Sequence, residues 1–321
     1  MEASLAADGA ASTKFAQGWY LLCWSSELEP SEVKPLRYFG EDYVLFRGED
    51  GNATLLDAHC PHLGAHLGYG GRVDGNDIIC PFHAWRFGSS GRCTEVPYAS
   101  RIPPRAAVNA YRVQEHSGMI VAYFGAEGSE PDYEVPVIEE MGHPAWTPLE
   151  ATHMEIATHP REVVENIADF AHFGPVHKTY IDDFQVIIDG PRATQRSIGY
   201  GYGLKGQRID LVSVATYHGP AIQFTRLNWG YDMLLINAHT PIEENKLFLR
   251  FGVMVKAGEG VTLPPAVLEG YIGAARDGYL EDVAIWENKR WRDQPIFADG
   301  DGPIGEVRKW YTSFYPHAAA P

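Results

Sequence analysis

The stretch Cys60–Trp85 reads CPHLGAHLGYGGRVDGNDIICPFHAW and contains two short cysteine–histidine pairs. A single proline separates Cys60 from His62, and Pro-Phe separates Cys80 from His83. Two thiolates and two imidazoles can hold a zinc ion, or a [2Fe–2S] cluster whose cysteines bind one iron and whose histidines bind the other. Zinc fingers usually pair cysteine with cysteine along the chain, whereas here each loop supplies one ligand of each kind. This order favours a [2Fe–2S] cluster held between two loops.

The sequence on both sides of these pairs predicts a compact β domain. From residue 18 to about residue 124, short apolar runs such as WYLLCW, DYVLFR and GMIVAYF are separated by Gly, Asp and Asn. The glycines, and the proline after each cysteine, suit loops whose backbone N–H groups approach bridging sulfides. We interpret His59 and His66 as structural or outer-sphere residues, and Cys23 and Cys93 as ordinary buried thiols.

Composition and charge limit the class of protein. With 321 residues, 45% of them hydrophobic and 21% charged, the chain can bury a sizeable core and suits two domains. Its formal net charge of -16 would repel nucleic acid and anionic lipid. The four cysteines do not make a disulfide framework, the first residues lack a secretory pattern, and no apolar run reaches the roughly 18 to 20 residues that span a bilayer. We therefore expect a cytoplasmic protein.

Residues 125–148 read as a connector, because they combine prolines and acids without periodicity. This divides the chain into a first domain of residues 1–130 and a second of residues 131–321. In the second, PREVVENIADFAHF and the stretch 265–290 are helical in pattern, while DMLLINAHT and LFLRFGVMV resemble strands of an antiparallel sheet. The predicted fold class is α+β, with an all-β first domain and a second domain of antiparallel sheet with helices.

A second group of candidate ligands lies in ENIADFAHFGPVH, residues 165–177. On a helix Asp169 and His172 would share a face, and Gly174-Pro175 would end that helix between His172 and His177. Two neutral imidazoles and one carboxylate form the facial triad that holds non-haem ferrous iron and leaves open positions for dioxygen. The third ligand of such a triad has to come from elsewhere in the chain.

Asp282 is the predicted third ligand. It falls on a mostly apolar stripe of the later helical pattern, with Tyr271, Ala275, Gly278, Ile285 and Lys289. A carboxylate on a buried helical face requires a cation or hydrogen-bond donors, and an iron ion would supply the charge. We prefer Asp282 to Glu281 and Glu287. The structural alternatives are a buried ion pair for Asp282 and a helix-capping role for Asp169.

These motifs resemble those of Rieske non-haem iron oxygenases. CPH…CPFHAWRF is similar to the cluster motif of that family, and Asn166-x-x-Asp169-x-x-His172-x4-His177 is similar to its mononuclear-iron motif. The resemblance implies a Rieske domain followed by a catalytic helix-grip domain. It also implies that Asp169 bridges His83 of one subunit and His172 of its neighbour, so that electrons cross the subunit contacts of a homotrimer.

Three stretches resemble the group that contains 3-ketosteroid 9α-hydroxylase oxygenases and cholesterol 7-desaturases. They are residues 35–51, 56–68 and 282–316, and the last lies outside the cluster motif and the histidine motif. The resemblance implies a monooxygenase that hydroxylates or desaturates a hydrophobic, steroid-like substrate. No flavin or nicotinamide fingerprint occurs, since GYGG lacks the strand, helix and following acid of a dinucleotide site. Electrons from NAD(P)H are therefore expected to arrive through a separate ferredoxin or flavin reductase.

Two other functions are compatible with the same residues. An O- or N-demethylase would use both metal centres to hydroxylate a methyl group, which then leaves as formaldehyde. An electron-transfer or redox-sensing Rieske protein would keep the cluster and bind a ligand without oxygenase chemistry. An iron assay separates this carrier from an oxygenase, because the carrier needs only the two irons of its cluster.

Overall fold

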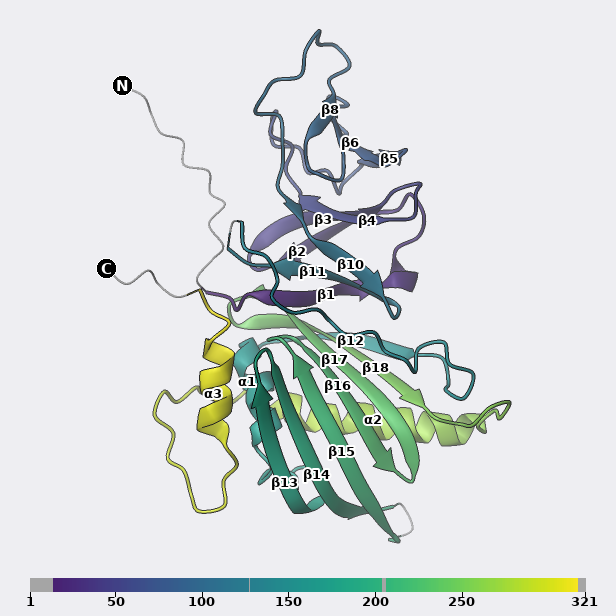
Figure 1. Cartoon of the computed structure of the whole chain (residues 1–321), viewed down its shortest axis with the longest axis vertical. Coiled ribbons are helices and arrows are strands. Elements are labelled where there is room, and N and C mark those ends of the chain that lie inside the picture. The colour runs from purple at the N-terminus through teal and green to yellow at the C-terminus, as the bar shows by residue number, and fades with distance from the viewer. Residues whose placement is uncertain (1–13, 127, 204–205, 317–321) are drawn as a thin grey trace. The chain divides into compact units, whose positions relative to one another are not determined.

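The computed structural model describes residues 14–126, 128–203 and 206–316, which form two compact units (Figure 1). One unit comprises residues 20–124, and the other comprises the residues from Gly125 onwards together with the described residues before Tyr20. The division therefore falls earlier than the predicted one after residue 130, and the stretch before Tyr20 joins the C-terminal unit. The predicted α+β class is confirmed, since the first unit consists mainly of strands and the second of a sheet with helices.

The N-terminal unit contains three small sheets whose strands follow the apolar runs of the sequence. In the sheet that contains residues 41–47 and 53–57, the side chains of Val44, Leu45 and Phe46 are fully buried, as are those of Leu55 and Leu56. The sheets are β1 (Gly18–Trp24), β11 (Met119–Phe124) and β10 (Val113–His116); β2 (Val33–Tyr38), β3 (Glu41–Arg47), β4 (Ala53–Asp57) and β9 (Ala110–Tyr111); and β5 (Arg72–Asp74), β6 (Asp77–Ile79), β7 (Arg86–Phe87) and β8 (Cys93–Glu95). A single 3-10 turn, η1 (Ser25–Glu27), follows β1.

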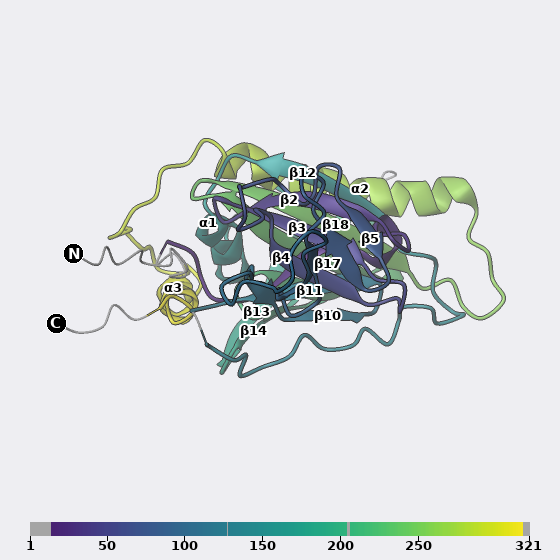
Figure 2. The same cartoon turned by 90° about the horizontal axis from the view of Figure 1, so that it is seen from above.

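The C-terminal unit is built on one antiparallel sheet of seven strands, in the order β12-β18-β17-β16-β15-β14-β13. The strands are β12 (Glu150–Ile156), β13 (Tyr180–Asp189), β14 (Arg192–Tyr202), β15 (Arg208–His218), β16 (Ile222–Trp229), β17 (Tyr231–Glu243) and β18 (Lys246–Val255). Along β14 every second residue from Ala193 to Gly201 is buried, because successive side chains of a strand point to opposite faces. The long helix α2 (Pro265–Trp286) lies along one face of this sheet (Figures 1 and 2), and Tyr271 and Tyr279 pack into its core.

Shorter helices carry the start of the histidine motif or pack against it. They are α1 (Pro160–Glu165), the 3-10 turn η2 (Asn166–Ala168) and α3 (Ile304–Thr312). The side chain of His159 caps α1, since its Nδ1 accepts a hydrogen bond from the Arg161 N–H at 3.1 Å. Trp310 of α3 is buried in the same apolar cluster as Ile167 and Ala168 of η2. The sheet and α3 together therefore fix the turn from which the candidate ligands emerge.

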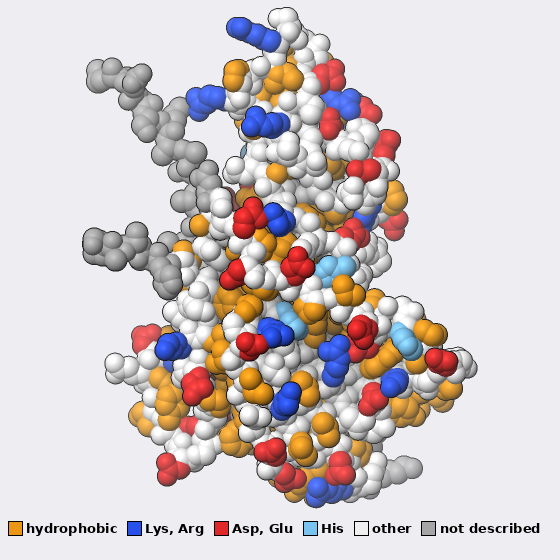
Figure 3. Space-filling model, viewed as in Figure 1, with side chains coloured by type: hydrophobic (Ala, Val, Ile, Leu, Met, Phe, Trp, Pro, Cys, Tyr) orange, Lys and Arg blue, Asp and Glu red, His pale blue; other side chains and the backbone are white. Residues whose placement is uncertain are grey.

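The surface carries charged side chains of both signs (Figure 3), as the composition of the chain predicts. On the face drawn in Figure 3, basic side chains are scattered among acidic ones wherever the structure describes the residues. No helix in the described part of the chain is long and apolar enough to cross a membrane.

Gly302 lies where the loop before α3 passes over η2. A Cβ at this position would overlap the carbonyl oxygen of Ala168, which is part of the backbone and cannot rotate away. We therefore expect Gly302→Ala to lower the free energy of unfolding by about 1–3 kcal/mol, as overpacking does. Urea unfolding followed by tryptophan fluorescence measures this change.

Gly305→Ala is the matched control, because a Cβ at Gly305 would meet no atom of the described residues within 4 Å. Alanine is the better helix former, so this variant should be at least as stable as the wild type. Equal stability of the Gly302 variant and the wild type would contradict the close approach of the loop to η2.

Candidate metal centres

Two loops of the N-terminal unit share one pattern of backbone hydrogen bonds. They span residues 60–65, between β4 and β5, and residues 80–85, between β6 and β7. In each, the N–H of the cysteine donates to the carbonyl five residues on, at 2.9 Å in the first loop and 2.8 Å in the second. The N–H four residues on donates to the cysteine carbonyl, at 2.9 and 3.1 Å. The residue that donates this second hydrogen bond has a positive φ in both loops, 76° at Gly64 and 56° at Ala84. The two loops therefore have nearly the same backbone conformation.

These loops bring the predicted cluster residues together. Cys60 and Cys80 are each 2% exposed and belong to the same buried cluster. The imidazole rings of His62 and His83 lie 4.5 Å apart between centroids, and His62 stacks on the Trp85 ring at 4.7 Å. The cysteines are thus buried beneath a pair of adjacent histidines. That these four residues bind the cluster stays a prediction.

The chemistry of this group fits a metal cluster. Burial raises the pKa of the Cys60 thiol to about 11, and the neighbouring Cys80 adds to the rise. Such a thiol becomes a thiolate at neutral pH only beside a cation. The Nδ1 atom of His62 is buried and has no hydrogen-bond partner among the residues that the structure describes. A buried nitrogen of this kind is costly, and a bond to iron would relieve the cost.

The second group of predicted ligands lies within the C-terminal unit. His172 and His177 come from the turns that follow η2, and Asp282 comes from α2. One ligand atom of each residue lies within 4.8 Å of the other two. The Asp282 Oδ1 atom is 3.2 Å from His177 Nε2 and 3.8 Å from His172 Nε2. The structure therefore brings the three residues together, while their role as iron ligands stays a prediction.

The helix expected across Asp169 and His172 is wrong. Both α1 and η2 end before Asp169, which has an extended backbone with φ -96° and ψ 90°. The Asp169 carboxylate accepts hydrogen bonds from the backbone N–H groups of Ala171 and His172. This local capping competes with helix formation and is favoured by aspartate, so the chain turns here and does not continue helically to Gly174-Pro175. The turn brings the rings of His172 and His177 to 5.1 Å between centroids.

The stripe predicted for α2 is correct at Asp282 but not throughout. Asp282 is 7% exposed, whereas Ile285, expected on the same stripe, is 44% exposed. Tyr279 and Val283 contact the core instead, with Trp286 one turn further on. The predicted stripe had the right period, with alternating steps of four and three residues, but the core-facing residues Tyr279, Val283 and Trp286 each lie one residue further along the helix, so the inward face is rotated by about 100° and Ile285 falls outside it.

Two residues contact the triad without having been predicted to do so. The Asn166 Nδ2 donates to Asp282 Oδ2 at 2.9 Å, and Glu281 Oε2 lies 3.0 Å from His177 Nδ1. The sequence indicated Glu281 as an alternative ligand, because it directly precedes Asp282. In the structure it contacts Nδ1 of His177, whereas Asp282 approaches Nε2 of the same ring. Asn166 stands three residues before Asp169, and nothing in that spacing indicates its partner on α2.

The remaining candidate carboxylates have separate partners. Asp169 Oδ2 lies 3.5 Å from His172 Nδ1, which is the ring nitrogen that does not approach Asp282. Glu287, the other alternative ligand, instead accepts a hydrogen bond from the Ala157 N–H at 3.0 Å. Asp169 therefore adjoins the triad through His172, and Glu287 does not belong to it.

The environment of His177 fits a cation bound to its Nε2 atom. Both ring nitrogens face carboxylate oxygens, those of Glu281 and Asp282. Burial opposes a positive charge on this ring, but the two carboxylates outweigh burial and raise the pKa of His177. Two imidazoles and one carboxylate around such a point are the ligand set that suits non-haem ferrous iron.

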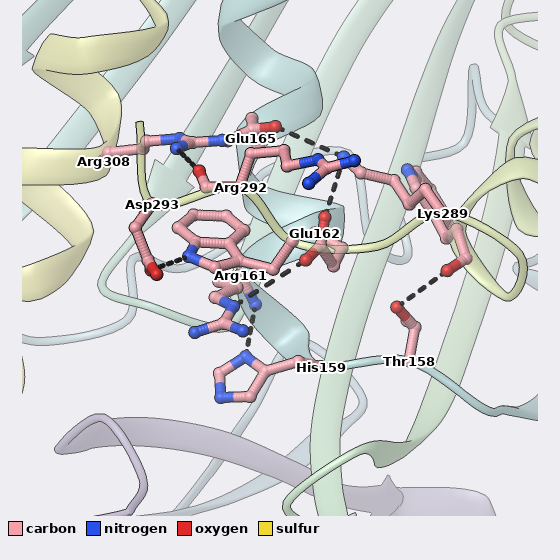
Figure 4. Close-up of polar contacts among 11 residues, drawn as sticks. Thr158, His159, Arg161, Glu162, Glu165, Lys289, Arg292, Asp293 and Arg308 are labelled. Carbon is pink, nitrogen blue, oxygen red and sulfur yellow. Dashed lines mark hydrogen bonds and ion pairs between the residues drawn. The ribbon is translucent and has the colours of Figure 1, made fainter. Parts of the chain in front are cut away.

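A network of charges holds α1 against the segment that follows α2 (Figure 4). Lys289 Nζ lies 2.7 Å from Glu162 and 3.2 Å from Glu165, which also accepts a hydrogen bond from Arg308. Burial would lower the pKa of Lys289, but the two glutamates raise it. Because Asn166 directly follows Glu165, this network fixes the helix end from which Asn166 reaches the triad.

His59 and His66 form a third polar group, in the N-terminal unit. With Asp42 they offer three ligand atoms within 4.8 Å of one another. His66 Nδ1, however, accepts a hydrogen bond from the Gly68 N–H at 2.9 Å, so neutral His66 carries its proton on Nε2. His59 lies between the Asp42 carboxylate and the Gly64 carbonyl, at 3.1 and 3.2 Å. These contacts agree with the structural interpretation of both histidines.

Family models match both units of the chain. Residues 18–112 match the Rieske [2Fe-2S] domain, and residues 122–315 match the C-terminal domain of 3-ketosteroid 9alpha-hydroxylase. Together these matches confirm the resemblance predicted from the motifs.

Relatives and a solved structure agree with these matches. A probable 3-ketosteroid-9-alpha-monooxygenase oxygenase component of Rhodococcus rhodochrous is 36% identical, over 94% of this chain and 80% of its own length. A cholesterol 7-desaturase of Xenopus laevis is 29% identical, over 94% of this chain and 72% of its own. Dicamba monooxygenase, crystallised with non-heme iron and dicamba, superposes with a TM-score of 0.72 at 17% identity, covering 95% of this chain and 98% of that one. This last similarity shows a common fold.

Proposed function

The chain belongs to the Rieske oxygenase components that carry a 3-ketosteroid 9α-hydroxylase C-terminal domain, and on that basis we propose that it hydroxylates or desaturates a steroid-like substrate. The substrate class is supported by relatives named for 3-ketosteroid 9α-monooxygenation and cholesterol 7-desaturation. The observation that carries the proposal is the meeting of His172, His177 and Asp282 in the C-terminal unit.

Both metal centres would be held by residues of this chain. The proposed ligands are Cys60, His62, Cys80 and His83 for the [2Fe–2S] cluster, and His172, His177 and Asp282 for a mononuclear Fe(II). Iron in a facial triad supplies the activation of dioxygen for attack on an unactivated C–H bond. Asn166 engages one Asp282 oxygen, so the other stays directed at the two histidines. The burial of the Asp282 carboxylate limits the access of water to this point.

Electrons would come from NAD(P)H through a separate ferredoxin or flavin reductase. The support is the membership of the chain among oxygenase components, together with the lack of a nucleotide-binding fingerprint in its sequence. A cytoplasmic location, where NAD(P)H is available, belongs to the same proposal.

In this proposal the enzyme is a homotrimer, in which Asp169 links His83 of one subunit to His172 of its neighbour. The distance of 3.5 Å between Asp169 Oδ2 and His172 Nδ1 supports this role, because it is one of the two contacts that the proposed bridge needs. The tips of the two cluster loops carry Leu63 and Phe82, which are 65% and 61% exposed. Exposed apolar side chains grouped beside a redox centre are typical of a surface that another protein covers.

Metal analysis and turnover test the proposed function together. In protein loaded anaerobically with iron and sulfide we expect three irons per chain, two from the cluster and one from the triad. With a surrogate reductase, NAD(P)H and oxygen, mass spectrometry of incubated steroids should show the gain of one oxygen atom or the loss of two hydrogens.

Two results would contradict this expectation in different ways. Two irons per chain without oxygen uptake would indicate an electron carrier. Formaldehyde release from aromatic ethers or amines, with no change in any steroid, would indicate a demethylase.

A further inference from the structure

Two consecutive carboxylates of α2 contact the two nitrogens of one imidazole. Glu281 Oε2 lies 3.0 Å from His177 Nδ1, and Asp282 Oδ1 lies 3.2 Å from His177 Nε2. The two acids differ in burial, since the side chain of Glu281 is 51% exposed and that of Asp282 is 10% exposed. Glu281 thus reaches the ring from the solvent side, and Asp282 from within the unit.

The protons of His177 determine what each contact does. A neutral imidazole carries one N–H and one lone pair. If the proton were on Nε2, it would point at Asp282 and no lone pair would remain for a metal on that side. With the proton on Nδ1, the ring donates a hydrogen bond to Glu281. The Nε2 lone pair then faces the Asp282 Oδ1 atom, and a cation bound to both atoms would remove the repulsion between them. The contact with Glu281 therefore selects the tautomer that can bind a metal through Nε2.

We infer that Glu281 is a positioning residue for the iron site, which fixes the tautomer and orientation of His177 and adds negative charge next to the metal. This inference rests on the proposed function, because it assumes that His177 binds iron. A carboxylate that accepts the outer N–H of a metal-bound histidine makes the ring a stronger donor and fixes its direction. Within the described part of the chain, neither of the other proposed ligands has a carboxylate partner at this distance: Asn166 is a neutral amide on Asp282, and Asp169 lies 3.5 Å from His172.

Partial exposure of Glu281 limits the expected effect. In Glu281→Ala, water can accept the Nδ1 proton, so the site should persist in a weakened form. Loss of such an outer partner costs about 10-fold to 100-fold in metal affinity, and we expect the lower end of this range. In Glu281→Gln the amide oxygen can still accept from Nδ1, so affinity should stay within about 3-fold of the wild type while the negative charge is lost.

The experiment uses the full chain with its cluster loaded. Affinity for Fe(II) is measured by competition with a chelator, and the symmetry of the site by the EPR spectrum of its ferrous–nitric oxide adduct. Glu281→Ala should weaken binding about 10-fold and change the adduct spectrum, and Glu281→Gln should restore affinity. Asp277→Asn, which removes a charge from an exposed position of α2 one turn earlier, should change neither property.

The outcomes separate this inference from the proposed function. If wild-type protein binds only the two irons of the cluster, the mononuclear iron site is excluded, and the role of Glu281 is excluded with it. Wild-type protein with three irons, beside a Glu281→Ala variant of equal affinity and identical adduct spectrum, overturns the inference alone. Weakened binding in Glu281→Ala that Glu281→Gln fails to rescue overturns the selection of the tautomer, and leaves charge as the only contribution of Glu281.

Discussion

Alanine in place of Asp282 should remove the proposed mononuclear iron and leave the proposed cluster intact, giving two irons per chain where we expect three in the wild type. Asp282 is the only carboxylate whose oxygen approaches an Nε2 atom of both histidines among the described residues. Loss of an outer partner already costs 10-fold to 100-fold in metal affinity, so loss of a ligand should cost more than about 100-fold. Turnover should fall below about 1% of the wild type, because open positions at bound iron are where dioxygen reacts.

Iron content, the EPR signal of the reduced cluster and steroid turnover measure this effect. Asp277→Ala is the matched control, since Asp277 lies on the same helix with a side chain that is 67% exposed. It should keep three irons and full turnover. An Asp282→Ala variant with three irons and wild-type activity would exclude Asp282 as a ligand and reopen the choice between Glu281 and an acid elsewhere.

The sequence was most informative about features that depend on residues close together in the chain. The cluster residues lie in two loops of a few residues, and their type and order carried the assignment before any long-range contact was known. His172 and His177 were predicted for the same reason. Asp282 is distant in the sequence and was still predicted as the third ligand, because a carboxylate on the buried face of a helix is unusual. The structure brings it next to both histidines, while its role as a ligand stays a prediction.

Two kinds of detail could not be read from the sequence. The helix predicted across Asp169 was wrong, since periodicity does not show whether an aspartate lies inside a helix or caps the next turn through its side chain. The contacts of Asn166 and Glu281 were missed, because they depend on how α1, η2 and α2 pack and on side-chain rotamers. Contacts of this kind connect residues far apart in sequence, and no spacing rule predicts them.

Asparagine in place of Asp169 should leave both metal centres loaded and reduce turnover to below about 1% of the wild type. Asparagine caps a turn about as well as aspartate, so the turn at residues 169–172 should survive the substitution. What it lacks is the negative charge that, in the proposed trimer, holds His172 of one subunit and His83 of its neighbour in one hydrogen-bonded path. Three irons per chain, a normal cluster EPR signal and slow reoxidation of the cluster in stopped-flow experiments with substrate and oxygen are the expected results.

Asp183→Asn, an exposed substitution on β13, is the control for the loss of one charge and should behave as the wild type. Full turnover of Asp169→Asn with three irons would contradict the bridging role. Mixed trimers test the direction of transfer: His83→Ala chains lack a cluster ligand and His172→Ala chains lack an iron ligand. If electrons cross between subunits, trimers containing both chains should recover activity that neither variant has alone. Transfer within one chain predicts no recovery, because no single chain would then hold both complete centres.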